Sequence, residues 1–118
     1  MSANSMNISI TTNNHNYGGL AFITKNSITR GSYTKLCFSL SNYSNTAGTF
    51  TVYCGASSVA SNPNLSGHLK AISTPTSNGT CTVDISGLSS TYSFYPVCGV
   101  AEQSGGKGTV TFEKVWLE

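Results

Sequence analysis

The chain has few side chains that could transfer protons in catalysis. Its 118 residues contain only four carboxylates and two histidines. Glycoside hydrolysis requires two carboxylates that flank the scissile bond, and Asp84, close to Ser86, is better placed to accept hydrogen bonds at a turn. Neither His15 nor His68 has an acid close in sequence, and no GxSxG motif supplies a nucleophile elbow. We therefore predict that the protein is not an enzyme.

The cysteines and the glycine-rich tract do not predict a cofactor. Structural zinc sites commonly place two cysteines within a few residues of each other, whereas the four cysteines of this chain are widely separated. The tract Gly105–Thr109 contains Gly-Lys-Gly-Thr but lacks the GxxxxGK[ST] spacing of a phosphate-binding loop. We expect neither a metal nor an organic cofactor, and we interpret Ser104–Gly108 as the loop of a tight hairpin.

Cys81 and Cys98 form a candidate pair. If the strands on either side of Ser86–Ser90 form a hairpin in which Ile85 faces Phe94, then Cys81 faces Cys98 on the buried side of that hairpin. The pair would then be either a disulfide or two free thiols that pack as small apolar side chains. Both alternatives are open at this point.

Tyrosine and asparagine side chains offer the clearest candidates for ligand binding. Sugar-binding β-sandwiches place exposed aromatic rings against pyranose C–H groups, and nearby amides and hydroxyls orient the ligand. Several tyrosines here fall in expected loops or on the expected polar faces of strands. The alternative is that half-buried tyrosines close the ends of the domain. The candidate ligand-binding residues are Tyr17, Asn42, Tyr43, Tyr53 and Tyr95.

Alternating apolar and polar residues predict the strands that would position these side chains. Leu36, Phe38 and Leu40 share one face of a strand, and similar alternation recurs along the chain. Between residues 56 and 75 the pattern is weaker, and a strand at His68–Ser73 is favoured over a helical turn. No window shows the periodicity of an amphipathic helix. The other expected strands lie near residues 6–10, 20–24, 49–54, 80–85, 93–98 and 109–117.

These strands predict an all-β fold, an antiparallel two-sheet β-sandwich of jelly-roll type with about eight strands. One domain spans residues 1–118, in which residues 1–16 form either a loose N-terminal segment or an edge strand. Charged residues make up 8% of the chain, against about 25% in an average domain. Ser, Thr and Asn take their place, a composition typical of secreted adhesins, sugar-binding modules and virion surface proteins.

Charge and hydropathy exclude two classes of partner. The net charge is +2, and the six cationic residues are scattered singly. Nucleic-acid binding depends on clustered basic residues that release counterions, so we expect no nucleic-acid partner. No run of apolar residues is long enough to predict membrane insertion, and Met1–Asn7 does not resemble a signal peptide. The expected location is a virion or an extracellular surface.

Two parts of the sequence resemble a known class of module. Ser27–Thr29 followed by Tyr33–Phe38 is similar to the opening of that class, and Thr82–Leu88 together with Val110–Glu118 is similar to its ending. The class comprises jelly-roll β-sandwiches, similar to carbohydrate-binding modules, at the C-termini of tail and other structural proteins of phages that infect Gram-positive gut bacteria. The resemblance covers about residues 17–118.

The resemblance implies a structural or receptor-binding role, and it transfers no ligand residues because it rests on core positions. The chain departs from the class at Thr29, where the class has Asp, and in its four cysteines. The expected function is that of a non-enzymatic virion component in a phage tail or receptor-binding assembly. Its partners would be host cell-surface polysaccharide, other virion subunits or a second copy of the chain. The alternative is a carbohydrate-binding module of a bacterial secreted or surface protein.

Overall fold

The computed structural model describes residues 4–61 and 68–118, except for the side chains of residues 14–18. All regular secondary structure in these residues is β-strand, and every strand pair is antiparallel. The prediction of an all-β antiparallel fold is therefore confirmed. The strands are β1 (Asn4–Ile23), β2 (Ile28–Thr29), β3 (Lys35–Ser57), β4 (Leu69–Ser73), β5 (Gly79–Asp84) and β6 (Ser93–Leu117).

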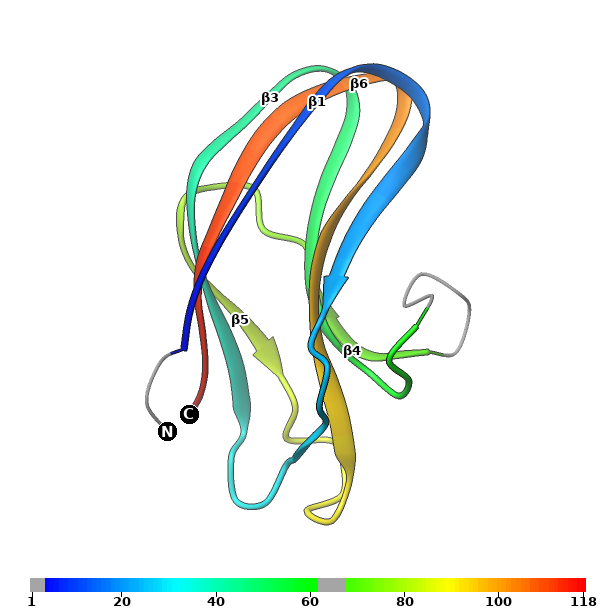
Figure 1. The fold of residues 1–118 in the computed structure, drawn as a ribbon. Coiled ribbons are helices and arrows are strands. Elements are labelled where there is room, and N and C mark those ends of the chain that lie inside the picture. The colour runs from blue at the N-terminus through cyan, green and yellow to red at the C-terminus, as the bar shows by residue number, and fades with distance from the viewer. Residues whose placement is uncertain (1–3, 62–67) are drawn as a thin grey trace.

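Three long strands form an arch. The hydrogen-bonded order is β1-β6-β3-β4, with β2 beside β6 and β5 beside β3. β1, β3 and β6 bend together at the top of the view in Figure 1, so that the halves of each strand run down opposite sides. We call these sides the first leg and the second leg. The first leg contains residues 4–12, 35–44 and 108–117 with β5, and the second contains residues 17–23, 49–57 and 93–103 with β2 and β4.

The described residues thus form six strands rather than about eight. The sequence predicts separate strands on either side of Ser104–Gly108, but β6 continues through this tract, and the prediction of a hairpin loop there is wrong. Ser104 and Gly105 have φ angles of 54° and 77°. Left-handed backbone at two successive residues turns the direction of the strand without ending it.

The backbones of β3 and β6 touch at the top of the arch. Gly48 has a φ of 57° and lies where β3 bends. A Cβ atom at Gly48 would lie 2.5 Å from the Ser104 carbonyl oxygen and from the Gly105 carbonyl carbon, and 2.6 Å from the Gly106 nitrogen. A side chain at this position would therefore push the two strands apart.

The apolar faces of the two legs enclose one core. Leu36, Phe38 and Leu40 of the first leg belong to the same buried cluster as Phe50 and Val52 of the second. The alternation that the sequence shows in these segments is confirmed, because the intervening residues face away from the core. The cluster also contains Ile10, Cys54, Ala56, Cys81, Val83, Ile85, Phe94, Cys98, Val100, Val110, Phe112 and Leu117.

β5 pairs with β3 and not with β6. Cys81 lies opposite Phe38 of β3, and Cys98 lies opposite Cys54. The predicted hairpin register that aligns Cys81 with Cys98 is therefore wrong. The residues after β5 cross from the first leg to the second, where the backbone N–H of Arg30 donates to the Tyr92 carbonyl at 2.8 Å. This crossing separates two strands that are close in sequence.

Two further predictions concern the ends of the sheet. The favoured strand at His68–Ser73 is confirmed, since β4 spans Leu69–Ser73. Residues 4–16, for which the sequence left a loose segment or an edge strand open, belong to β1, the terminal strand in the order of the sheet. Because β1 runs along both legs, it forms an edge of the sheet in each of them (Figure 1).

Candidate functional site

A hollow of about 640 Å³ lies on the outer face of the second leg. Thr49, Thr51 and Tyr53 alternate with the core residues of β3, and so their side chains point away from the core. Thr49 and Thr51 lie opposite Gln103 and Ala101 of β6, so these five residues share one face. We call this hollow the outer groove. It is lined by Gly19, Thr49, Thr51, Tyr53, Leu69, Ile72, Thr74, Ala101, Glu102 and Gln103.

The floor of the outer groove is formed by small residues and by Tyr53. A Cβ atom at Gly99 would lie 2.9 Å from the Tyr53 hydroxyl oxygen and would collide with the Leu20 carbonyl oxygen. Tyr53 therefore lies across Gly99, and only 4% of its surface is exposed. Its ring contributes to the base of the groove but does not offer an open face to a sugar.

A second hollow, of about 430 Å³, adjoins the first near the bend of β3. We call it the bend groove. Tyr43 is half-buried here, with its ring centroid 6.5 Å from that of Phe50 at an interplanar angle of 43°. The backbone N–H of Tyr43 donates to the Asn78 side-chain oxygen at 2.8 Å, which ties the segment before β5 to β3. The bend groove is lined by Tyr43, Asn45, Gly48, Thr49, Phe50, Thr51, Val52, Thr74, Pro75 and Thr76.

The two grooves share Thr49, Thr51 and Thr74. Their polar lining consists mainly of threonine hydroxyls and carboxamide groups, and Glu102 is the one charged residue among the described residues that line them. Neutral groups that both donate and accept hydrogen bonds match a neutral ligand with many hydroxyl groups. The surface therefore offers hydrogen bonds without a strong field for ions.

Asn42 lies at a bulge of β3 in the first leg and lines neither groove. It has a φ of 55°, a left-handed conformation that asparagine adopts more readily than most residues. Its side-chain nitrogen donates to the Thr111 hydroxyl at 3.3 Å, and its backbone carbonyl accepts from the Thr109 hydroxyl at 2.5 Å. The predicted ligand-binding amide is thus engaged within the sheet.

The five predicted ligand-binding residues do not meet at one point. Tyr43 and Tyr53 line adjoining grooves, whereas the half-buried Tyr95 lies opposite Ser57, toward the far end of the second leg. The Tyr17 side chain lies outside the described residues, although the Tyr17 backbone is opposite Gln103. Tertiary structure thus groups two of the five tyrosine and asparagine positions.

The sequence also contained a signal for groove residues outside the predicted set. Thr49 and Thr51 alternate with buried residues, which places them on a polar face. That pattern does not reveal that Ile72 of β4 and Thr74, which follows β4, lie beside this face, because strand pairing between β3 and β4 is a long-range contact.

Asp84 is the last residue of β5 and accepts hydrogen bonds from the turn that follows it, as the sequence predicted. Its carboxylate accepts hydrogen bonds from the Ser86 hydroxyl at 2.6 Å and from the Ser86 backbone N–H at 2.9 Å. These two bonds hold the pKa of Asp84 below its ordinary value of 3.8, and the bond from the Ser86 hydroxyl has the larger effect. The carboxylate therefore stabilises the end of β5 locally.

Replacing Ser86 with alanine is expected to raise the pKa of Asp84 toward its ordinary value. Because the pKa of Asp84 is lower in the folded state than in the unfolded state, the carboxylate stabilises the fold at pH values above the unfolded-state pKa. This stabilisation is lost as the pH falls through the folded-state pKa. Ser86→Ala should weaken that acid dependence. Carbon-13 NMR titration of the Asp84 carboxyl measures the shift, and Ser90→Ala in the same loop serves as the control. Equal titration in both variants would contradict the assignment.

The four cysteines are free and buried. Cys54 lies opposite Cys98 and hydrogen-bonds to Cys81, so it is the common neighbour of the two cysteines that the sequence predicted as a pair. The bond between Cys54 and Cys81 raises the pKa of Cys54 and lowers that of Cys81. Burial raises the pKa of Cys98 to about 12. Burial is also the main reason that the pKa of Cys37 is raised, and the nearby Glu118 carboxylate adds to this effect.

The described part of the chain has neither a group of metal ligands nor a membrane-spanning helix. Within residues 4–61 and 68–118, no three His, Cys, Asp or Glu side chains are grouped so that they could hold a metal ion. The same residues contain no helix that could cross a membrane.

Comparisons of this chain with known protein families, sequences and structures identify no related protein. No family model, no curated protein and no solved structure matches this chain. The outer groove and the bend groove are therefore interpreted from their own chemistry.

Proposed function

We propose that this domain is a non-enzymatic binding module that holds a neutral glycan chain in the outer groove and the bend groove. The observation that carries the proposal is the continuity of the two hollows, which share three threonines and have one charged residue among their described lining residues. Sugar hydroxyls exchange hydrogen bonds with threonine hydroxyls and with the Gln103 amide, and Tyr43 supplies an aromatic edge at one end.

The dimensions of the site favour an oligosaccharide over a single sugar. The hollows measure about 640 and 430 Å³, and each falls within the range of small-molecule sites, roughly 300–1,000 Å³. Both hollows are lined by Thr49, Thr51 and Thr74. A chain of sugars that crosses these threonines would bury hydroxyl and C–H groups in both hollows.

The biological setting follows from the resemblance to phage modules. We place the domain in a virion, as a tail or receptor-binding component that contacts polysaccharide on the host surface, with other virion subunits or further copies of the chain beside it. In this proposal the arched sheet, whose two legs enclose one core, is a variant of the two-sheet jelly-roll sandwich. The alternative setting, a carbohydrate-binding module of a bacterial secreted or surface protein, uses the same grooves.

A glycan array followed by calorimetric titration tests the function. We expect the domain to bind a neutral bacterial polysaccharide. The combined substitution Thr51→Val and Gln103→Ala should weaken that binding about tenfold or more, because it removes two hydrogen-bonding groups worth ~1 kcal/mol each. Both residues line the outer groove and neither belongs to the core cluster.

Thr80→Val provides the matched control, because Thr80 is exposed on β5 in the first leg, away from both grooves. Its affinity for the glycan should equal that of the unmodified protein. Unchanged affinity in the double variant would show that the ligand lies elsewhere. Failure to bind any bacterial glycan, together with a stable oligomer in solution, would favour a scaffolding role instead.

A further inference from the structure

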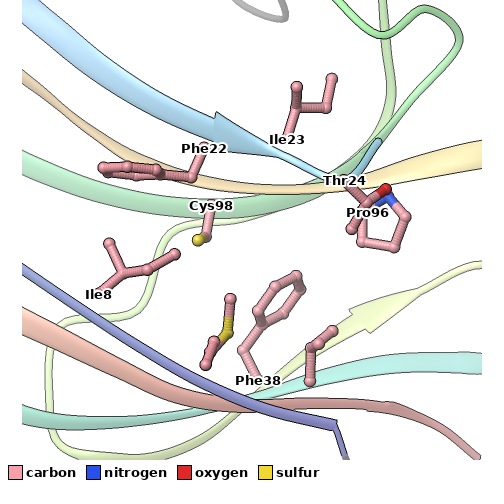
Figure 2. A pocket seen from close by; sticks show the side chains of 9 residues that line it. Ile8, Phe22, Ile23, Thr24, Phe38, Pro96 and Cys98 are labelled. Atoms are coloured by element: carbon pink, nitrogen blue, oxygen red, sulfur yellow. The ribbon is translucent and has the colours of Figure 1, made fainter. Parts of the chain in front are cut away.

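An apolar cavity of about 160 Å³ lies between the two legs. Figure 2 shows Ile8 on one side of this space and Phe22 on the other, with the Cys98 sulfur directed into it. We call it the inner cavity. It is lined by Met6, Ile8, Phe22, Ile23, Thr24, Phe38, Pro96, Cys98 and Val115.

The cavity exists because the legs are not closed along β1. Leu20 and Phe22 lie opposite Val100 and Cys98, and the pairing places them on the core-facing side of the sheet. Val100 and Cys98 are buried, but Leu20 and Phe22 remain 49% and 38% exposed. Large side chains that point inward and still reach solvent mark an opening to the space between the legs.

We propose that the inner cavity is a binding site for a small uncharged hydrophobic molecule, of the size of one aromatic ring, held against Ile8, Phe22 and Cys98. An apolar protein cavity of about 150 Å³ binds benzene in another protein, and the inner cavity measures about 160 Å³. The size of the space therefore suits a single ring.

The lining decides the chemistry of the ligand. Among the residues that the structure describes, no charged residue lines the inner cavity, and Thr24 is the one lining residue with a side-chain hydroxyl. That hydroxyl already donates to the Asn26 carbonyl at 3.1 Å. An ion or a sugar would lose its hydration here without gaining partners, whereas a hydrocarbon gains dispersion contacts with the walls of the cavity.

A second apolar space of about 260 Å³ continues from the inner cavity toward the ends of β1 and β6. The two spaces share Met6, Thr24, Pro96 and Val115. A ring in the inner cavity could thus carry a short alkyl extension into this space. The preferred ligand is an alkylbenzene-like or branched hydrocarbon group rather than a polar aromatic.

The inner cavity is independent of the proposed glycan site. It faces the core, and none of its described lining residues also lines the outer groove or the bend groove. Hydrophobic ligand binding can therefore fail while glycan binding succeeds, and the reverse.

NMR titration of the full chain with benzene and toluene tests the proposal. We expect saturable shifts of the methyl signals of Met6 and Ile8, and little change at Ile72, which is 54% exposed on β4. At a toluene concentration ten times Kd, the melting temperature should rise by about 5 °C, since the ligand binds only the folded state. Benzoate at the same concentration should cause neither effect.

Ile8→Phe is the decisive variant. Ile8 is half-buried and lines the inner cavity, so the larger phenylalanine side chain should fill it. Toluene should then cause no saturable shift at Met6 and no rise in melting temperature. Ile72→Phe makes the same change outside the cavity and should leave toluene binding intact. Non-saturable shifts in the unmodified protein, or equal toluene binding by Ile8→Phe, would overturn the proposal.

Discussion

Replacing Gly48 with alanine is expected to lower the free energy of unfolding by at least ~3 kcal/mol. Two costs combine at this position. The backbone is left-handed, with a φ of 57°, and the added Cβ would lie 2.5 Å from backbone atoms of Ser104 and Gly105. Backbone atoms cannot rotate away as a side chain can, so β3 and β6 would have to separate at the bend. Urea denaturation followed by circular dichroism measures the loss.

Gly31→Ala separates the two costs. Gly31 has nearly the same φ, 60°, but apart from its own neighbours in the chain, no described heavy atom lies within 4 Å of a Cβ atom at this position. This variant should lose only about 1 kcal/mol, the cost of left-handed backbone in a residue with a side chain. If Gly48→Ala were no less stable than Gly31→Ala, the close contact between β3 and β6 would not matter for the arch.

Phe112→Ala is expected to cost about 4 kcal/mol, the usual range for a buried phenylalanine. Phe112 is 0% exposed and belongs to the core that the two legs enclose. Its removal leaves a void, and the β-sheet on either side cannot collapse to fill it without changing the register of β6 with β1 and β3. The same denaturation experiment measures the effect.

Phe22→Ala provides the matched comparison. Phe22 also points between the legs, but it lies at the open edge and is 38% exposed. Its truncation should cost only about 1 kcal/mol, since less apolar surface returns to water. Equal losses in the two variants would mean that the β1 edge is closed in solution, which would also weaken the inference of an accessible inner cavity.

The arch gives its two faces different chemistry. Residues that point into it are mainly apolar, and along β1 they leave the inner cavity open. Residues that point outward from the second leg carry hydroxyls and amides in the outer groove. Successive residues of one strand thus contribute to two kinds of site, as the alternation of side chains across a sheet requires.

Local patterns in the sequence were sufficient for several features. The alternation in Leu36–Leu40 and in Thr49–Cys54 predicted both the strands and their buried faces, because side chains in a strand point to opposite sides with a period of two. The role of Asp84 followed from its neighbour Ser86, and the strand at Leu69–Ser73 followed from residues within it. Each of these features depends on residues close together in the chain.

Features that depend on distant residues required the tertiary structure. The sequence did not show that β6 continues through Ser104 and Gly105, that β5 pairs with β3, or that Tyr53 is covered. Strand pairing joins residues whose separation no local pattern records, and a serine or glycine tract fits a hairpin loop as well as a bend in a long strand.

The scarcity of acids and histidines, from which the absence of catalysis was predicted, is a property of the sequence itself. The sequence also determined which side chains could bind a neutral ligand, because it contains many hydroxyls and amides and few charges. Only the tertiary structure decided which of them meet. Pairing of β4 with β3 brought Thr74, which follows β4, to Thr49 and Thr51, while Asn42 was engaged at a bulge of the first leg.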